Sequence, residues 1–351
     1  MDGLLTNRRI LVTGGAGFIG SALIWYLNRL GIDDIVVVDR LGKGEKWRHL
    51  VPLRFRDYLE ADELESLVSE RPTRLQDIGA VFHLGACSST TETDASYLAR
   101  NNFAYTKMLA EWALAGARRF VYASSGATYG ARELDLREDL EPSELRPLNM
   151  YGYSKQLFDA YAARSGLLDR IVGLKYFNVY GPNEDHKGDM RSVIAKAFES
   201  IRHDGVVRLF KSYRPEFAHG EQTRDFIYVK DAVAMTLHLA SATNARGLYN
   251  IGSGQGRTWR DLATAVFAAL ELAPRIEFVE MPATLQPKYQ YATRATIERL
   301  LASGYDRPIT SLEEGVADYV RGYLVPDRLL GEEPAPVEPG KVRRLRSVRH
   351  S

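Results

Sequence analysis

Val12-Thr-Gly14-Gly-Ala-Gly17-Phe-Ile-Gly20 is the stretch that decides the fold of this 351-residue chain. It follows an apolar run over residues 8–13 that predicts a buried strand, and it leads into a helical pattern over residues 21–30. The spaced glycines permit a tight turn and let the backbone approach a pyrophosphate at the N-terminus of that helix. Asp39 ends the next apolar run, at the distance typical of a ribose contact. The pattern predicts a dinucleotide-binding site.

Apolar runs alternate with helical patterns through the first half of the chain. This alternation is typical of an α/β fold with a doubly wound, Rossmann-type parallel sheet. Further strands are expected at residues 34–39, 80–84, 119–123, 170–176, 225–229 and 247–251, with helices near 93–116 and 151–165. Beyond residue 182 the pattern becomes irregular, which predicts a smaller C-terminal α+β cap with helices near 190–203, 258–271, 294–303 and 312–323 and a strand at 275–279.

These patterns divide the chain into two predicted domains and a tail. A dinucleotide-binding domain is expected over residues 1–180, and the chain is expected to return to it at about 225–251. Residues 181–224 and 252–325 would form the substrate-binding cap. Residues 326–351 are rich in Pro, Glu and Arg and poor in apolar residues, so they predict a disordered basic tail.

The composition excludes several classes of function. Lys and Arg total 46 against 45 Asp and Glu, so no overall basic field favours a nucleic-acid partner. No apolar run is long enough to cross a membrane, and the N-terminus has no signal-peptide pattern. The single cysteine, Cys87, excludes an internal disulfide and fits a reducing compartment. We expect a cytoplasmic enzyme without a membrane partner or a bound metal.

Tyr151 and Lys155 form the pattern with the most chemical content. Residues four apart lie on one face of a helix, so the ammonium is expected to lower the pKa of the phenol and suit it to proton transfer. The alternative is an ordinary exposed pair of side chains. Ser125 ends an expected strand at the edge where ligands bind in open sheets. It is therefore placed to hydrogen-bond a substrate hydroxyl together with Tyr151. The alternative for Ser125 is a cap on the next turn.

Two questions about the predicted cofactor site stay open: which form of the cofactor binds, and what Cys87 does. Arg40 and Lys46 follow Asp39 and could hold a 2′-phosphate, so NADP is favoured over NAD. Exposed cations after a strand can also be solvated surface. Cys87 lies in a run of small residues after an expected strand; we interpret it as packing beside the cofactor, since no base is spaced to activate it as a nucleophile.

The glycine loop, the strand-end serine and the Tyr-x-x-x-Lys pair together resemble the extended short-chain dehydrogenase/reductase superfamily of nucleotide-sugar epimerases and dehydratases. Four longer segments are similar to its ADP-L-glycero-D-manno-heptose 6-epimerase branch: His83-Leu-Gly-Ala-Cys-Ser-Ser-Thr-Thr-Glu92, Asn149-Met-Tyr-Gly-Tyr-Ser-Lys-Gln-Leu-Phe-Asp159, Lys175-Tyr-Phe-Asn-Val-Tyr-Gly-Pro-Asn-Glu-Asp-His-Lys-Gly188 and Arg224-Asp-Phe-Ile-Tyr-Val229. The similarity runs from about residue 9 to 324. It implies an isomerase that inverts C6 of an ADP-linked heptose for the lipopolysaccharide inner core, using bound NADP, and a homo-oligomer.

The resemblance also implies roles for individual residues. The implied catalytic residues are Ser125, Tyr151, Lys155 and Lys187, with Lys187 as a second acid-base group. Together with the glycine loop, the expected cofactor contacts are Gly14, Gly17, Phe18, Ile19, Gly20, Asp39, Arg40, Lys46, Gly85, Ala86, Cys87, Ser88, Asn101, Lys155 and Val179. The candidate substrate contacts are Asn178, Asp189, Lys196, Phe210, Arg224 and Tyr289. Three of these positions depart from the branch: Arg40 stands where Asn is common, Asp189 where Ser is common, and Lys196 replaces a His.

Three competing functions remain to be weighed. A nucleotide-sugar 4,6-dehydratase would carry an Asp-Glu pair after the strand-end hydroxyl, where this chain has Gly126 and Ala127. A UDP-hexose 4-epimerase shares the catalytic core but would not need Lys187. An NADP-binding regulatory protein would not need the complete set of Ser125, Tyr151 and Lys155.

Overall fold

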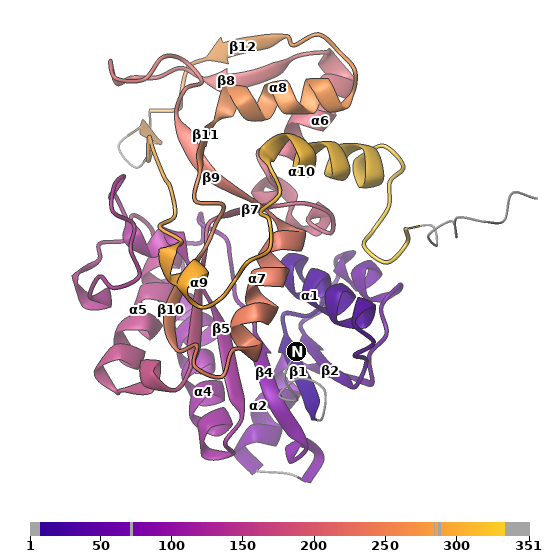
Figure 1. Cartoon of the computed structure of the whole chain (residues 1–351), viewed down its shortest axis with the longest axis vertical. Coiled ribbons are helices and arrows are strands. Elements are labelled where there is room, and N and C mark those ends of the chain that lie inside the picture. The colour runs from indigo at the N-terminus through magenta and orange to yellow at the C-terminus, as the bar shows by residue number, and fades with distance from the viewer. Residues whose placement is uncertain (1–7, 71–72, 284, 287–288, 334–351) are drawn as a thin grey trace, which may run out of the picture.

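The computed structural model describes residues 8–70, 73–283, 285–286 and 289–333. A seven-stranded, all-parallel sheet forms its centre, in the order β10-β6-β5-β4-β1-β2-β3 (Figure 1). Its strands are β1 (Arg9–Thr13), β2 (Ile35–Asp39), β3 (Asp57–Glu60), β4 (Ile78–His83), β5 (Arg119–Ser125), β6 (Val172–Tyr176) and β10 (Gly247–Ile251). The predicted doubly wound parallel sheet is confirmed, and β3 is a strand that the sequence patterns did not reveal.

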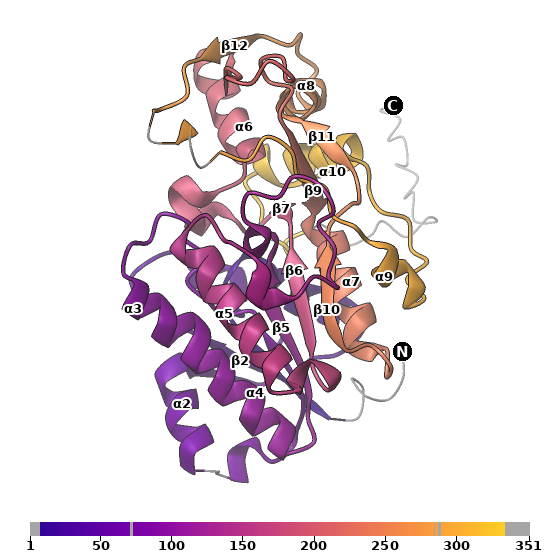
Figure 2. The same cartoon turned by 90° about the vertical axis from the view of Figure 1, so that its left-hand side faces the viewer.

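Helices cover both faces of this sheet. On one face α1 (Phe18–Arg29) packs beside α7 (Val229–Ser241), and their apolar residues join Ile10 and Val12 of β1 in one core. On the other face α2 (Ala61–Glu70), α4 (Tyr105–Ala115) and α5 (Met150–Arg164) pack against Leu11 and its neighbours (Figure 2). Because successive side chains of a strand point to opposite faces, a nearly continuous apolar run is buried on both sides.

Two smaller sheets and three helices form the cap above the carboxyl ends of the main strands (Figure 1). One sheet has the order β11-β9-β7, and the other pairs β12 with β8. Their strands are β7 (Asn178–Tyr180), β8 (Val207–Phe210), β9 (Thr223–Tyr228), β11 (Gly256–Thr258) and β12 (Ile276–Val279). The helices α6 (Val193–Asp204), α8 (Trp259–Ala269) and α10 (Leu312–Tyr319) pack with them, and α9 (Glu298–Ala302) lies lower, beside β10.

The expected return of residues 225–229 to the main sheet is wrong. β9 pairs with β7 and β11 in the three-stranded sheet, and only β10 completes the main sheet after α7. Phe226, Ile227 and Tyr228 are all buried, and a strand buried on both faces has the same apolar pattern in either sheet. The pattern therefore predicts the strand but not its partner.

Two further expectations need correction at their boundaries. The helix expected over residues 93–116 consists of α3 (Ala95–Leu98), a π-helical turn at Ala99–Ala104 and α4. The tail expected to be disordered from residue 326 is ordered as far as 333: Leu330 is fully buried, and its N–H donates to Asn183 Oδ1 at 2.9 Å. Residues 334–351, the rest of that predicted tail, lie outside the described residues. Short helical turns complete the cleft region, among them η1 (Lys46–Leu50), η4 (Gly126–Tyr129) and η7 (Asp185–Met190).

Candidate active site

A cleft of about 490 Å³ opens at the carboxyl ends of the main strands, beneath the cap. This is where open parallel sheets bind their ligands. Most of the predicted site residues line it: Gly14, Gly17, Phe18, Ile19, Gly20, Asp39, Lys46, Gly85, Ala86, Ser88, Ser125, Tyr151, Lys155, Asn178, Val179, Lys187 and Arg224. One cleft therefore joins the predicted cofactor, catalytic and substrate positions.

The glycine loop forms one wall of the cleft and fits a dinucleotide. Gly17 donates its N–H to the carbonyl of Gly14 at 3.0 Å, which closes the turn ahead of α1. A Cβ at Gly20 would collide with that same carbonyl, and a Cβ at Gly14 would lie 2.6 Å from the backbone of Gly85. Only glycine fits these positions. The N-cap of α1 is Gly17, which has no side chain to satisfy the first N–H groups, so they can meet a phosphate.

Charged groups cluster at the end of the cleft where a ribose is expected. Asp39 accepts hydrogen bonds from Ala16 N at 2.9 Å, from Arg40 N at 2.7 Å and from Lys46 Nζ at 2.6 Å. The Arg40 guanidinium donates to Asn101 Oδ1 at 2.8 Å and also pairs with Asp62. The structure thus brings Asp39, Arg40, Lys46 and Asn101 together.

Ser125, Tyr151 and Lys155 meet at the centre of the cleft. Tyr151 and Lys155 lie on α5, whose N-cap Asn149 accepts the N–H of Gly152 at 2.8 Å. The Tyr151 phenol shares a hydrogen bond with Ser125. Ser125 Oγ also accepts the N–H of Ala127 at 3.1 Å, so the serine caps η4 as well as meeting the phenol. The interpretation of Ser125 as a cap is confirmed, and its contact with a substrate hydroxyl stays a prediction.

The expected effect of Lys155 on Tyr151 is wrong. Burial raises the pKa of Tyr151, and the hydrogen bond from Ser125 opposes this only in part. Lys155 is also buried, and burial lowers its pKa to about 8. Its Nζ donates to the carbonyl of Ala123 at 2.8 Å. Helical spacing predicts the shared face, but it cannot predict that the ammonium bonds to the neighbouring strand.

A buried ion pair near these residues joins β6 to α5, and hydroxyl groups of β5 bond to it. Lys175 Nζ lies 2.6 Å from Asp159 Oδ2, and both side chains are at most 1% exposed. Asp159 also accepts hydroxyl groups from Tyr122 at 2.9 Å and Ser124 at 2.7 Å, while Lys175 donates to Thr128 Oγ1 at 2.7 Å. Because Ser124 and Thr128 flank Ser125, this network fixes the strand end. Sequence reasoning missed it, although Asp159 lies one turn after Lys155.

A second group of buried hydrogen bonds surrounds His83 and Asn102. His83 lies between the hydroxyls of Thr13 at 2.7 Å and Thr106 at 2.8 Å, and burial lowers its pKa to about 3, so it is neutral. Asn102 accepts the N–H of Cys87 at 2.9 Å and donates to the Cys87 carbonyl at 2.9 Å. The backbone of Cys87 is thereby held beside Tyr151 and Lys155, which fits a packing position.

Lys187 reaches the cleft from η7. Its Nζ lies 5.2 Å from the centre of the Phe18 ring, at the start of α1. Burial lowers the pKa of Lys187, and the charge of Glu184 opposes this shift. Glu184 is itself buried and bonds to Ser192 N at 2.5 Å and Ser192 Oγ at 2.6 Å, which ties together the two ends of the η7 segment. An amine whose pKa is lowered by burial therefore lines the same cleft as the Tyr151 phenol.

Arg224, on β9, forms the far wall of the cleft. Its guanidinium lies 5.1 Å from the ring centre of Tyr289 and 5.5 Å from that of Trp259, and Trp259 Nε1 donates to the Tyr289 hydroxyl at 2.9 Å. Burial lowers the pKa of Arg224 but leaves a guanidinium charged. A stacked guanidinium facing a cleft is suited to bidentate binding of a phosphate.

Comparison with known proteins matches this geometry to one family. Residues 10–252 match the model of the NAD dependent epimerase/dehydratase family. An ADP-L-glycero-D-manno-heptose-6-epimerase of Nitratidesulfovibrio vulgaris is 52% identical over 315 residues, covering 90% of this chain and 97% of that protein. The chain belongs to the NAD dependent epimerase/dehydratase family.

Solved structures agree with this assignment. The ADP-L-glycero-D-manno-heptose-6-epimerase of Helicobacter pylori superposes with a TM-score of 0.76 at 26% identity, over 92% of this chain and 98% of that one. A UDP-glucuronic acid 4-epimerase from Bacillus cereus, in complex with UDP-glucuronic acid and NAD, superposes with a TM-score of 0.72 at 26% identity, over 90% and 99% of the two chains. That Bacillus cereus enzyme therefore binds a nucleotide sugar and NAD on a fold like this one.

Some predicted contacts lie away from the cleft of this family member. Asp189 and Lys196 are exposed, and neither they nor Phe210, at the end of β8, line the described cleft. Tyr289 adjoins it through Arg224. Arg40, Cys87 and Asn101 are not among its lining residues either, although Arg40 contacts Asn101 and Cys87 lies between Ala86 and Ser88, which do line it. In the described part of the chain, no helix is long and apolar enough to span a membrane.

Proposed function

We propose that this protein interconverts ADP-D-glycero-β-D-manno-heptose and ADP-L-glycero-β-D-manno-heptose by transient oxidation at C6, with bound NADP. The observation that carries the proposal is the shared cleft, in which Ser125, Tyr151 and Lys155 lie together with a second amine, Lys187. The 52% identity to an ADP-heptose 6-epimerase supports the same substrate. The reaction would supply heptose for the lipopolysaccharide inner core.

The chemistry of C6 explains why two proton-transfer groups are needed. This carbon bears a hydroxyl and no acidic proton, so inversion requires a ketone that is reduced again on its other face. Bound NADP would supply the hydride acceptor and donor for this oxidation and reduction. Because hydride must leave one face of C6 and return to the other, the substrate oxygen must occupy two positions relative to the groups that line the cleft. We assign Tyr151, with Ser125, to one position and Lys187 to the other, each exchanging a proton with the oxygen at its own position.

The protonation of the two groups suits this division. The raised pKa of Tyr151 keeps its phenol protonated and able to donate, whereas the lowered pKa of Lys187 makes a neutral, accepting amine easier to reach. Lys155 holds the backbone of β5 through the Ala123 carbonyl, and so steadies the strand that ends at Ser125. Arg224 is the proposed grip on the diphosphate, with Asn178 beside it in the cleft.

NADP is the proposed form of the cofactor, with NAD as the alternative. Asp39 already accepts three hydrogen bonds, from Ala16, Arg40 and Lys46, which leaves it less able to receive a ribose hydroxyl. Two cationic side chains flank it and would attract a 2′-phosphate. Lys46→Ala should weaken NADP binding more than NAD binding. Equal losses for the two cofactors, measured by titration calorimetry, would contradict this assignment.

The deciding experiment incubates the purified protein with ADP-D-glycero-β-D-manno-heptose and follows the ratio of C6 epimers by NMR. Tyr151→Phe and Lys187→Ala should each slow the reaction by about 10²–10⁴-fold. Lys107→Ala, an exposed lysine of α4, is the control and should match the wild type. A protein that leaves this substrate unchanged but equilibrates UDP-glucose with UDP-galactose would support the 4-epimerase alternative. Binding of NADP without turnover of either substrate would support a regulatory protein.

The oligomeric state, cellular location and partners of the enzyme stay predictions. A homo-oligomer and a cytoplasmic location are expected from the sequence and its resemblance, and no nucleic-acid or membrane partner is expected. Size-exclusion chromatography with light scattering measures the first of these directly.

A further inference from the structure

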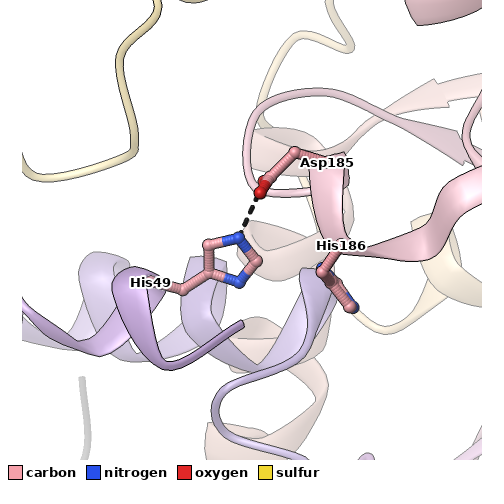
Figure 3. A group of neighbouring side chains, drawn as sticks. All are labelled: His49, Asp185 and His186. Atoms are coloured by element: carbon pink, nitrogen blue, oxygen red, sulfur yellow. Dashed lines mark hydrogen bonds and ion pairs between the residues drawn. The ribbon is translucent and has the colours of Figure 1, made fainter. Parts of the chain in front are cut away.

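The short helix η1 contacts both the glycine loop and the segment that carries Lys187. His49, on η1, is fully buried; its Nδ1 lies 2.8 Å from the carbonyl oxygen of Ala16 and its Nε2 lies 2.8 Å from Asp185 Oδ1 (Figure 3). Ala16 belongs to the glycine loop, and Asp185 begins η7, two residues before Lys187. One imidazole therefore bridges two segments that lie 169 positions apart, counted from Ala16 to Asp185.

Both partners of His49 are hydrogen-bond acceptors, and this indicates which of its ring nitrogens carry hydrogen. A carbonyl oxygen and a carboxylate oxygen only accept hydrogen bonds, so both ring nitrogens of His49 must carry hydrogen. Burial is the largest single influence and would raise the pKa of Asp185, but the hydrogen bond from His49 and the other nearby groups together leave that pKa below its ordinary value. Asp185 is therefore the acceptor in this pair, and the ring of His49 is the donor on both sides. The other charged or titratable groups around this pair are His186, Lys187 and Lys46.

A metal ion is the competing explanation for this cluster. The potential ligand atoms of His49, Asp185 and His186 lie within 4.8 Å of one another. Both nitrogens of His49 are already used, however, and the His186 ring is close enough to Lys187 and Lys46 that their charges help lower its pKa, after burial, to about 4. Two nearby ammonium groups oppose a divalent cation. The geometry fits a hydrogen-bonded bridge better.

We propose that His49 is a positioning residue that holds Lys187 in place against the glycine loop. Lys46, at the other end of η1, bonds to Asp39, which in turn accepts the N–H of Ala16. The peptide groups of Ala16 are thus held on their N–H side through Asp39 and on their carbonyl side by His49. The same imidazole ring holds Asp185, and so the start of η7. This inference rests on the acid-base role proposed for Lys187.

The first test reads the protonation of His49 without any substrate. In protein labelled with ¹⁵N-histidine, His49 should show two protonated ring nitrogens at neutral pH, assigned by its loss in His49→Gln. In Asp185→Asn, which is nearly isosteric and half exposed, the resonance should shift to that of a neutral ring. A neutral His49 in the wild-type protein would overturn the proposal, whether or not the epimerase function holds.

The second test reads the coupling to Lys187. Asp185→Asn should lower kcat by on the order of tenfold to a hundredfold with little change in KM, because a displaced proton-transfer group slows chemistry more than binding. In a Lys187→Ala background the same change should cost nothing further. His203→Gln, in the exposed His203–Asp204 pair of α6, is the matched control and should leave kcat unchanged. Losses that multiply in the double variant, or a wild-type kcat for Asp185→Asn, would refute a role through Lys187.

Discussion

Lys175→Met should destabilise the protein by about 3–5 kcal/mol, because it leaves the buried carboxylate of Asp159 without its counter-charge. Lys175 and Asp159 are 1% and 0% exposed, and their charged atoms lie 2.6 Å apart. Methionine retains most of the volume of lysine, so the cavity that forms is small. The loss is therefore mainly electrostatic, joined by the hydrogen bond to Thr128 at 2.7 Å.

A second substitution separates charge from packing. Asp159→Asn in the Lys175→Met background removes the stranded charge and should return part of the lost stability. The double variant should stay about 1–3 kcal/mol below the wild type, since the hydroxyls of Tyr122 and Ser124 lose a strong acceptor. The two substitutions are thus expected to be far from additive.

Urea denaturation followed by circular dichroism measures these differences through the midpoint and slope of each unfolding curve. Lys107→Met is the control: its partner Glu111 is 3.9 Å away and both side chains are well exposed, so the loss should be less than about 1 kcal/mol. If Lys175→Met costs no more than this control, the pair is not the buried support described above. Additive losses in the double variant would contradict the coupling of the two charges.

Three further predictions concern other parts of the site. Gly130→Ala should cost about 1–3 kcal/mol in urea denaturation or prevent folding, because φ is 68° at Gly130 and a Cβ there would collide with the carbonyl of Arg146. Stability should fall by about 2 kcal/mol between pH 7 and pH 5, because buried His83, with its pKa lowered to about 3, stays neutral while its unfolded form takes up a proton below pH 6.5. His83→Gln should weaken this dependence, and an unchanged slope would exclude His83 as its source. Arg224→Lys should raise KM at least roughly tenfold in epimerisation assays, since lysine keeps the charge but loses the stacking on Tyr289; an unchanged KM would argue against a diphosphate contact.

The parts of the fold that could be predicted are those that depend on the pattern of residues close together in the sequence. The glycine loop, the buried strands around it and the shared face of Tyr151 and Lys155 follow from spacing within about ten residues. The family resemblance added Lys187, which local chemistry alone would have left as a surface lysine. The cleft brings these positions together because parallel strands all end at one edge of the sheet.

The parts that could not be predicted depend on contacts between distant segments. β9 has the pattern of any buried strand, and only its neighbours assign it to the cap. The raised pKa of Tyr151 depends on how deeply the phenol is buried and on Lys155 bonding to β5. The bridge from His49 to Asp185 spans 136 positions, and nothing in either short segment indicates the other.

These distant contacts support the two proposed proton-transfer groups in different ways. Tyr151 is held by α5, whose Asp159 is locked to Lys175 in the interior, so damage there should appear first as lost stability. Lys187 is held from a shorter segment by a half-exposed carboxylate and one imidazole ring, so damage there should appear as lost turnover in a folded protein. An enzyme that must present a proton-transfer group at each of two positions needs both supports. Lys175→Met and Asp185→Asn should therefore fail in distinguishable ways, the first in the unfolding curve and the second in kcat.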